Sequence, residues 1–255
     1  MKQTPRGRGL GWRPQKPDHR DVFYSAPLIT TPLPSSVDLR PQCPPVYDQG
    51  QLGSCTGNAI AGAIHFDRQK QKLATPAPPS RLMIYYLERE IEGTIGYDAG
   101  AEIRDGIKAV AATGTCFEDS WPYDVNKFTQ RPPQGCYNAA AKDKAVKYLV
   151  VLQLAQQLRG CLAEGYPFVF GFTCFEGLDS DVVEQTGNLP MPGPQDQPIG
   201  GHAVMAVGYD DAKRHFIVRN SWGAVWGDKG YFYMPYEYMQ RADLSSDFWT
   251  VRLVG

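Results

Sequence analysis

The chain has 255 residues, enough for one domain or two small ones with a substantial buried core. Hydrophobic residues make up 42% and charged residues 21% of the sequence, which excludes a disordered or fibrous chain. The 26 lysines and arginines nearly balance the 27 aspartates and glutamates, so no overall field favours nucleic acid or an anionic membrane, and we expect neither as a partner.

Residues 1–36 differ in composition from the rest of the chain. They hold six prolines, three glycines, six basic residues and two acidic ones, so they carry +4 while residues 37–255 carry −5. Such a segment cannot build a core, and its charge favours an extended arm that lies on the body. The alternatives are a loose tail or a segment that docks on a partner.

The sequence shows no membrane segment and no signal peptide. The longest apolar run has ten residues, which suits a strand, and the first thirty residues lack the apolar stretch of a leader. We therefore expect a soluble protein, cytoplasmic or exported after removal of a leader, and a monomer.

Helical patterns follow the arm. Residues 55–73 predict a helix with one apolar side and polar last turns that contain Asp67 and Arg68, and a proline-rich segment at 75–79 ends it. Further helices are predicted over 81–91 and 101–113, the second ended by Gly114. Residues 138–165 predict more helix with a short strand at 148–152.

Strand patterns dominate the last part of the chain. Strands are predicted over 168–175, 202–209, 215–221, 231–234 and 248–253, and residues 210–214 make a hairpin connection. The loop 177–201 is rich in glycine, proline and aspartate. Its acidic, proline-rich part, 177–198, either restricts the cleft or decorates the surface, and we favour surface decoration. Helices followed by antiparallel strands indicate an α+β protein with two subdomains, residues 37–137 mainly helical and 138–255 mainly β, and a cleft between them.

Cys55 is a candidate nucleophile because it opens the first predicted helix. A helix N-terminus and a neighbouring imidazolium both stabilise a thiolate. Gly50, Gly53 and Ser54 allow a sharp entry into that helix. The six cysteines fit no paired zinc pattern, so we expect no metal and no cofactor, and the disulfide state stays open.

The hairpin at 202–221 places an amide beside a histidine. A turn centred near Ala212 puts His202 opposite Trp222 and diagonal to Asn220, and a tighter register puts it opposite Asn220. In both registers the Asn220 amide oxygen can accept from one imidazole nitrogen and leave the other facing a thiol, with Trp222 covering the pair from water. Gln49, six residues before Cys55, can help the Cys55 backbone N–H to hold a developing oxyanion.

These residues lie in three segments that resemble signature motifs of the papain-like cysteine peptidases, in the manner of the bacterial branch of that family. The segments are DQGQLGSC at 48–55, GHAVMAVGY at 201–209 and NSWGAVWGDKGY at 220–231. His202 and Asn220 follow Cys55 by 147 and 165 residues, close to the family spacing. The resemblance covers about 37–255 and includes VDLR at 37–40 and WPY at 121–123.

The resemblance implies a two-subdomain papain-like fold, with a helical subdomain and an antiparallel barrel-like one, and a thiol protease. It makes Cys55 the nucleophile, His202 the acid and base, Asn220 its orienting partner and Gln49 the oxyanion donor. Substrate-binding positions implied by the same motifs are Gly100, Ala101, Ile103, Gly171, Gly201, Ala203, Trp222 and Ser246. The arm is too short and proline-rich for the family's helical prodomain, yet its position suggests a zymogen in which residues 1–36 lie along the cleft.

The sequence departs from the family pattern at Leu52, which replaces a cysteine, and at Thr56, which replaces an aromatic residue. Leu52 removes a usual disulfide partner, and Ala101 stands where the family has a second glycine. The function expected is endopeptidase cleavage of a peptide or protein through an acyl-enzyme. The alternatives are a catalytically silent binding protein on the same fold, and a transpeptidase or amidase that uses the same acyl-enzyme.

Overall fold

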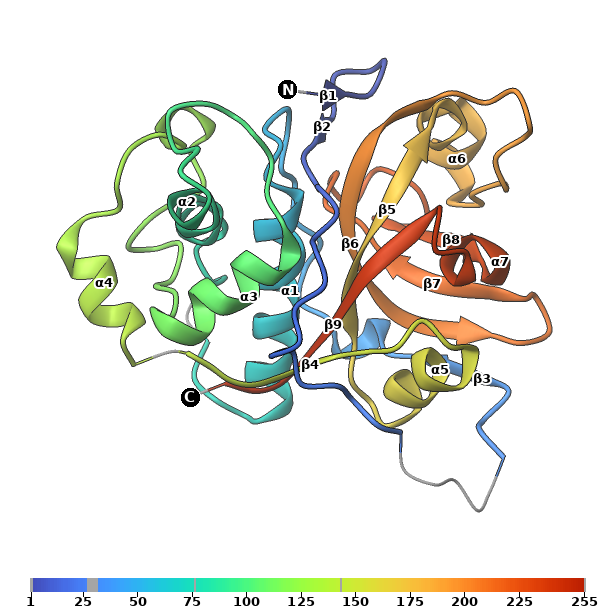
Figure 1. Ribbon diagram of the computed structural model, residues 1–255, viewed down its shortest axis with the longest axis horizontal. Helices are drawn as coiled ribbons and strands as arrows, with labels where there is room; N and C mark the ends of the chain where they lie inside the picture. The colour runs from blue at the N-terminus through green and yellow to red at the C-terminus, as the bar shows by residue number, and fades with distance from the viewer. Residues whose placement is uncertain (1, 27–31, 76, 143, 255) are drawn as a thin grey trace.

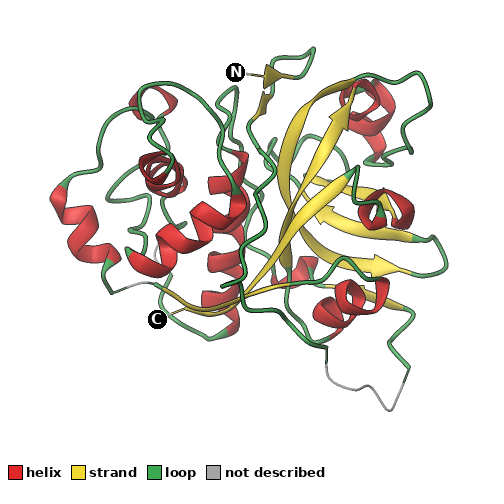
Figure 2. Cartoon of the chain, in the orientation of Figure 1, coloured by secondary structure: helices red, strands yellow, loops and turns green. Residues whose placement is uncertain are grey.

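The computed structural model describes residues 2–26, 32–75, 77–142 and 144–254, and separates into a helical and a sheet-rich half (Figures 1 and 2). The helical half holds α1 (Cys55–Lys70), α2 (Arg81–Ile91), α3 (Ile103–Ala112) and α4 (Gln134–Ala140). The papain-like α+β arrangement expected from the motifs is therefore present.

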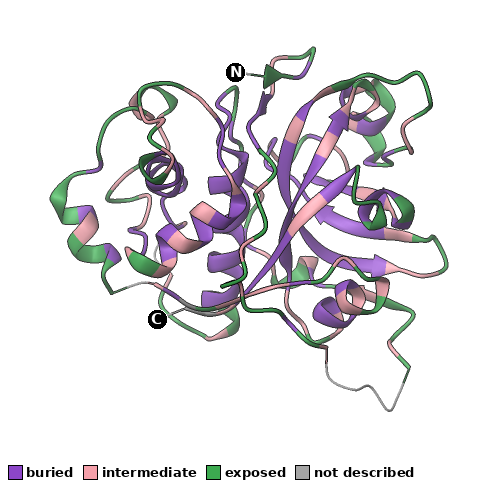
Figure 3. Ribbon diagram, in the orientation of Figure 1, coloured by how far each residue is buried: buried purple, intermediate pink, exposed green. Residues whose placement is uncertain are grey.

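Helix α1 is the central element between the two halves. Every residue from Cys55 to Arg68 is buried, because α1 packs against α2, α3 and the sheet (Figure 3). Of the polar residues expected in the last turns, Asp67 and Arg68 are thus buried, whereas Lys70 and Lys72 are exposed. The period-3.6 pattern of α1 is weak for the same reason, since a helix covered on all sides needs no polar face.

Helix α2 follows the predicted bounds because its end signals are local. The Ser80 hydroxyl accepts a hydrogen bond from the Met83 backbone N–H at 3.2 Å, and Gly93 follows the helix end with a φ of +69°.

The sheet has seven strands in the order β4-β9-β5-β6-β7-β8, with β3 paired to β6. All the recorded pairs are antiparallel, and the sequence of pairing leaves β4 and β8 at opposite ends rather than closing a barrel. The strands are β3 (Ser36–Asp38), β4 (Ala145–Val150), β5 (Phe168–Phe175), β6 (Pro198–Asp210), β7 (His215–Arg219), β8 (Tyr231–Pro235) and β9 (Ser245–Val254).

Two predicted regions differ from the structure. Residues 138–165 form the end of α4, strand β4 and α5 (Ala155–Ala163) instead of one helix with a strand inside it. The predicted loop 177–201 contains the short helix α6 (Asp181–Thr186) and the first residues of β6. The remaining short elements are α7 (Tyr236–Gln240) and the 3-10 helices η1 (Arg40–Gln42), η2 (Val125–Lys127) and η3 (Glu176–Asp179).

The N-terminal arm lies between the two halves, where it appears as a thin blue trace running from top to bottom in Figure 1. It begins with the hairpin β1 (Lys2–Gln3) and β2 (Gly9–Leu10), and Leu10 and Trp12 are buried. Farther along, Asp21 pairs with Arg104 of α3 at 2.5 Å, and the Tyr24 N–H donates to the Val150 carbonyl at 2.7 Å. The arm is therefore held along the body, as its charge predicted.

Candidate active site

Cys55 stands at the first position of α1, beneath the arm. Its side chain is fully buried, and the backbone groups of Gly11, Thr56 and Ala203 lie close enough to the thiol to favour its charged form, which partly offsets the rise in its pKa caused by burial. Because Ala203 follows His202 directly on β6, the thiol lies beside the strand position that carries the imidazole. The loop before Cys55 is held by Asp98, which accepts from the Gly53 N–H at 2.9 Å.

His202 and Asn220 meet across the hairpin of β6 and β7. Met205 pairs with Arg219, beyond a bulge that shifts the register by one residue. If this pairing is continued along both strands, His202 lies opposite Trp222. This is the register predicted for a turn centred near Ala212. The two rings stack with centroids 4.8 Å apart.

A single hydrogen bond sets the orientation of the imidazole. Asn220 Oδ1 accepts from the Ser221 N–H and lies 2.8 Å from His202 Nε2, so Nε2 carries the ring proton. In the described part of the chain the buried Nδ1 has no hydrogen-bond partner. A neutral imidazole held this way offers Nδ1 as a free base.

Gln49 is fixed by the residue that follows Asn220. Its Oε1 accepts from the Ser221 hydroxyl at 2.6 Å, and its backbone N–H donates to the Ser221 carbonyl at 2.9 Å. The side-chain Nε2 donates to the Leu52 carbonyl at 2.9 Å and to the Gly9 carbonyl of the arm at 3.1 Å. A carbonyl of the arm therefore takes one hydrogen bond that this amide can give.

The arm also takes the backbone hydrogen bonds of the expected substrate-binding positions. The Ala101 N–H donates to the Gly11 carbonyl at 2.8 Å, and its carbonyl accepts from the Arg13 N–H at 3.1 Å. The Gly201 carbonyl accepts from the Trp12 N–H at 3.1 Å. Gly100 has a φ of +69°, and a Cβ there would lie 1.9 Å from the Gly11 carbonyl oxygen, so the close approach requires glycine.

Three expected subsite residues lie side by side on neighbouring strands. Gly171 of β5 pairs with Ala203 of β6 and with Ser246 of β9. The Trp12 ring covers Gly171 so closely that a Cβ there would be 1.9 Å from it. Ile103 is buried at the start of α3, in the same hydrophobic cluster as Trp12.

Sequence analysis missed Asp247, the residue after Ser246. Its Oδ2 accepts from Trp12 Nε1 and from the Gln15 N–H, both at 3.0 Å. Its φ of +62° is unusual for a residue with a side chain, and no sequence pattern indicates it.

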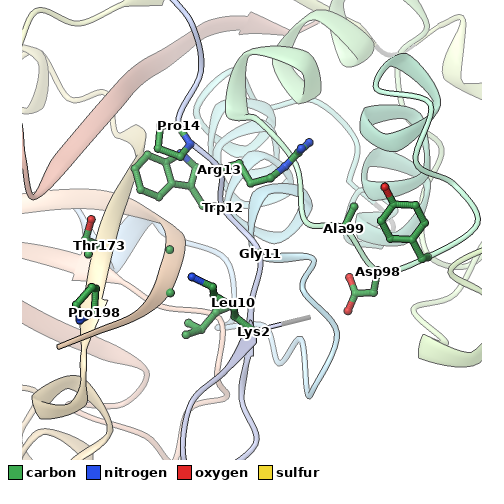
Figure 4. Close-up of a pocket in the computed structure, with 13 residues that line it drawn as sticks. Lys2, Leu10, Gly11, Trp12, Arg13, Pro14, Asp98, Ala99, Thr173 and Pro198 are labelled. Carbon is green, nitrogen blue, oxygen red and sulfur yellow. The ribbon is translucent and has the colours of Figure 1, made fainter.

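An open groove remains beside the arm (Figure 4). It has a volume of about 590 Å³ and runs between Asp98 and Ala99 on one side and Thr173 and Pro198 on the other, with Trp12 between them. The cleft between the halves is therefore only partly filled by the arm.

Burial changes the acidity of both groups. It raises the pKa of the Cys55 thiol to about 12 and lowers the pKa of His202 to about 4. Both groups are neutral near pH 7 in this state, so the thiol is a poor nucleophile.

The cysteines, all of which lie in the described residues, are free of disulfides. Within the same residues no cluster of three or more His, Cys, Asp or Glu side chains could hold a metal ion, and no helix has the length and apolarity needed to cross a membrane.

Comparisons with known proteins identify relatives of this chain. The family described as papain family cysteine protease matches residues 33–250. An uncharacterized peptidase C1-like protein of Acanthamoeba polyphaga mimivirus is 42% identical over 97% of this chain and 88% of its own. The crystal structure of xylellain, a cysteine protease from Xylella fastidiosa, is 42% identical, with a TM-score of 0.92 over 100% of this chain and 98% of that one. A digestive procathepsin L 3 from Tenebrio molitor larval midgut shares the fold, with 19% identity and a TM-score of 0.68 over 94% and 75% of the two chains.

Proposed function

This chain belongs to the papain family of cysteine proteases, and we propose that Cys55, His202, Asn220 and Gln49 are its catalytic residues. The protein is thus a peptidase that cleaves peptide bonds. The observation that carries the assignment is the hydrogen-bonded set in which Ser221 holds Gln49 and Asn220 holds His202, next to the first residue of a helix.

The reaction follows from these positions. With the arm withdrawn, His202 Nδ1 takes the Cys55 proton, and the thiolate attacks the scissile carbonyl carbon. Gln49 Nε2 and the Cys55 N–H donate to the oxygen that becomes negative. The C–N bond then breaks, His202 gives its proton to the leaving amine, and a thioester remains. Water, which loses a proton to His202, attacks this thioester and releases the acid and Cys55.

We further propose that residues 1–36 keep the enzyme latent. The support is that Gly9 and Gly11 occupy hydrogen-bonding groups around Gln49, Ala101 and Cys55, while burial holds the dyad neutral. The arm is part of the same chain, so each molecule fills its own cleft and we propose a monomer. The helical subdomain 37–137 and the β subdomain 138–255 would supply the two walls of the cleft.

We assign the substrate backbone to Gly100, Ala101 and Gly201, because the arm backbone is held there. The side chain of the substrate residue in that place enters the pocket that Trp12 fills. That pocket is formed by Ile103, Gly171, Ala203 and Ser246, and Asp247 at its end would bind a hydrogen-bond donor.

The test is turnover of a fluorogenic dipeptide by the full chain, before and after its arm is cut away, under reducing conditions. A site for a specific protease, inserted between Pro32 and Leu33, allows folding with the arm in place. Turnover that rises on cutting and is absent in Cys55→Ala supports both proposals. Equal turnover before and after cutting contradicts latency, and activity that survives Cys55→Ala contradicts the catalytic assignment.

A further inference from the structure

Two arginines of the arm are held by three carboxylates of the body, Asp179, Asp181 and Glu184, which we name the acidic wall. Arg8 pairs with Asp179 and with Glu184, the latter at 2.6 Å. Arg6 pairs with Asp181 and Glu184, and its backbone N–H donates to Asp179 at 2.8 Å. The acidic wall is formed by η3 and α6, in the segment expected to be surface decoration, so that interpretation is wrong.

The acidic wall lies on the leaving-group side of the cleft. The Arg8 guanidinium carbon is 5.3 Å from the centre of the Trp222 ring, and the imidazole of His202 also stacks on this ring, at 4.8 Å between centroids. His202 gives its proton to the leaving amine, so the space beyond Trp222 receives the peptide that departs. The Gly9 carbonyl accepts a hydrogen bond from Gln49, and Arg8 and Arg6 precede Gly9 by one and three residues, with Arg6 in the turn that joins β1 to β2. Arg8 and Arg6 are thus within three residues of the position of the reacting carbonyl.

Asp179 distinguishes the acidic wall from an ordinary group of solvated surface carboxylates, because it is buried in the arm-bound structure. Its side chain is only 1% exposed, and in the described residues its carboxylate has two recorded partners, the Arg8 side chain and the Arg6 N–H. Both belong to the arm. The 1% exposure is that of the arm-bound state. A departing arm removes both partners of this carboxylate and leaves a site that favours a new cation.

We propose that the acidic wall selects substrates with a basic side chain among the first three residues of the leaving peptide. The inference rests on the proposed catalytic roles, and it names the substrate class of the same cleft. The arm occupies the acidic wall as a stand-in for such a substrate, with Arg6 and Arg8 in the place of its basic residues. Guanidinium suits the site because it pairs with carboxylates and stacks on an aromatic face.

The test uses the full chain with the cleavable insertion between Pro32 and Leu33, cut after folding and separated from its arm at high salt. The substrates are quenched fluorescent peptides with one common acyl side. Each carries one arginine at the first, second or third leaving position, or citrulline, its neutral isostere, at the same position. At one position at least, we expect kcat/KM to be about tenfold or more higher for arginine than for citrulline, the range of a hydrogen bond to a charged group.

Variants link the preference to the acidic wall. Asp179→Asn with Glu184→Gln should bring the arginine-to-citrulline ratio close to one, because both carboxylates that pair with Arg8 lose their charge. Glu184→Gln alone should lower the arginine-to-citrulline ratio in part. This single variant replaces the double variant in the test if the double variant does not fold. Glu237→Gln removes a carboxylate that pairs with Arg214 instead, and it should leave the ratio unaltered.

The outcomes separate this inference from the catalytic proposal. Citrulline peptides that are cleaved by a Cys55-dependent reaction, with ratios near one at all three positions, overturn the acidic-wall inference alone. A preference for arginine that survives in both variants does the same. If no peptide is cleaved, the proposed catalytic roles are contradicted, and the acidic-wall inference that rests on them is contradicted as well.

Discussion

Replacing Trp12 by alanine in the full chain should release the arm and activate the enzyme. Trp12 is only 7% exposed, its ring fills the space above Gly171, and its Nε1 donates to Asp247 at 3.0 Å. Truncating a buried tryptophan costs roughly 3–5 kcal/mol, and the loss falls almost entirely on the arm-bound state because the ring leaves the pocket with the arm. At about 1.4 kcal/mol per tenfold change, even the lower figure raises the released fraction by roughly a hundredfold.

The assay for this prediction is turnover of a fluorogenic dipeptide by the uncut chain, with activity itself showing that the body is folded. Trp12→Ala should raise turnover by about two orders of magnitude, or up to the rate of the arm-free enzyme if that is reached first. Trp12→Phe keeps a ring without the donor and should lie in between. Phe23→Ala, which removes an arm side chain that is 54% exposed, should change little. Turnover of Trp12→Ala equal to that of the unaltered chain would refute the reasoning.

Three further predictions concern the catalytic residues and the core. Gln49→Ala in the arm-free enzyme should lower kcat by roughly 100- to 1,000-fold, and an unchanged kcat would exclude an oxyanion role. Because burial raises the pKa of the Cys55 thiol to about 12, iodoacetamide should alkylate the uncut chain slowly at pH 7 and faster as the pH rises, whereas the arm-free chain should react readily at pH 7; equal rates for the two forms would be inconsistent with this. Burial raises the pKa of Asp67 to about 7 from the 3.8 of an exposed carboxyl, so the folded state loses stability as the pH rises from about 4 through 7. Asp67→Asn should therefore gain stability over the unaltered protein by roughly 2–4 kcal/mol at pH 8 and by little at pH 4, in urea unfolding curves at each pH. A difference that does not vary with pH would argue against a buried carboxyl as the cause.

The catalytic set is the part of the molecule that local rules predict best. A turn centred near Ala212 predicts that His202 and Asn220 share a face. The hairpin end instead pairs Asp210 with His215, and the bulge between Ala206 and Gly208 restores the register that brings the two side chains together. The position of Cys55 at the start of a helix is likewise predicted from its neighbours Gly50, Gly53 and Ser54, and no distant residue is needed for that prediction. For the same reason the bounds of α2, which has its own cap, agree with the prediction.

Residues that depend on distant contacts were beyond sequence reasoning. Asp67 and Arg68 have the composition of a solvated helix end, and only packing against other elements buries them. Asp179 and Asp247 lie in segments with no periodic pattern, yet each holds an arginine or a tryptophan more than 170 positions away. Patterns of neighbouring residues in the sequence do not indicate which distant residues pair in the fold.

If the proposed latency is relieved by a cut between the arm and Val37, the pairing of β3 with β6 affects which molecule can make that cut. Val37 pairs with Tyr209, seven residues along β6 from His202, so the end of the arm is roughly 23 Å from the imidazole at 3.3 Å per residue. A molecule that cuts this bond with its own Cys55 must first release β3 from the sheet, whereas another molecule need only reach the end of the arm. If that other molecule is an activated copy, maturation becomes self-amplifying. Its time course then shows a lag that shortens as the protein concentration rises, and a trace of mature enzyme removes the lag.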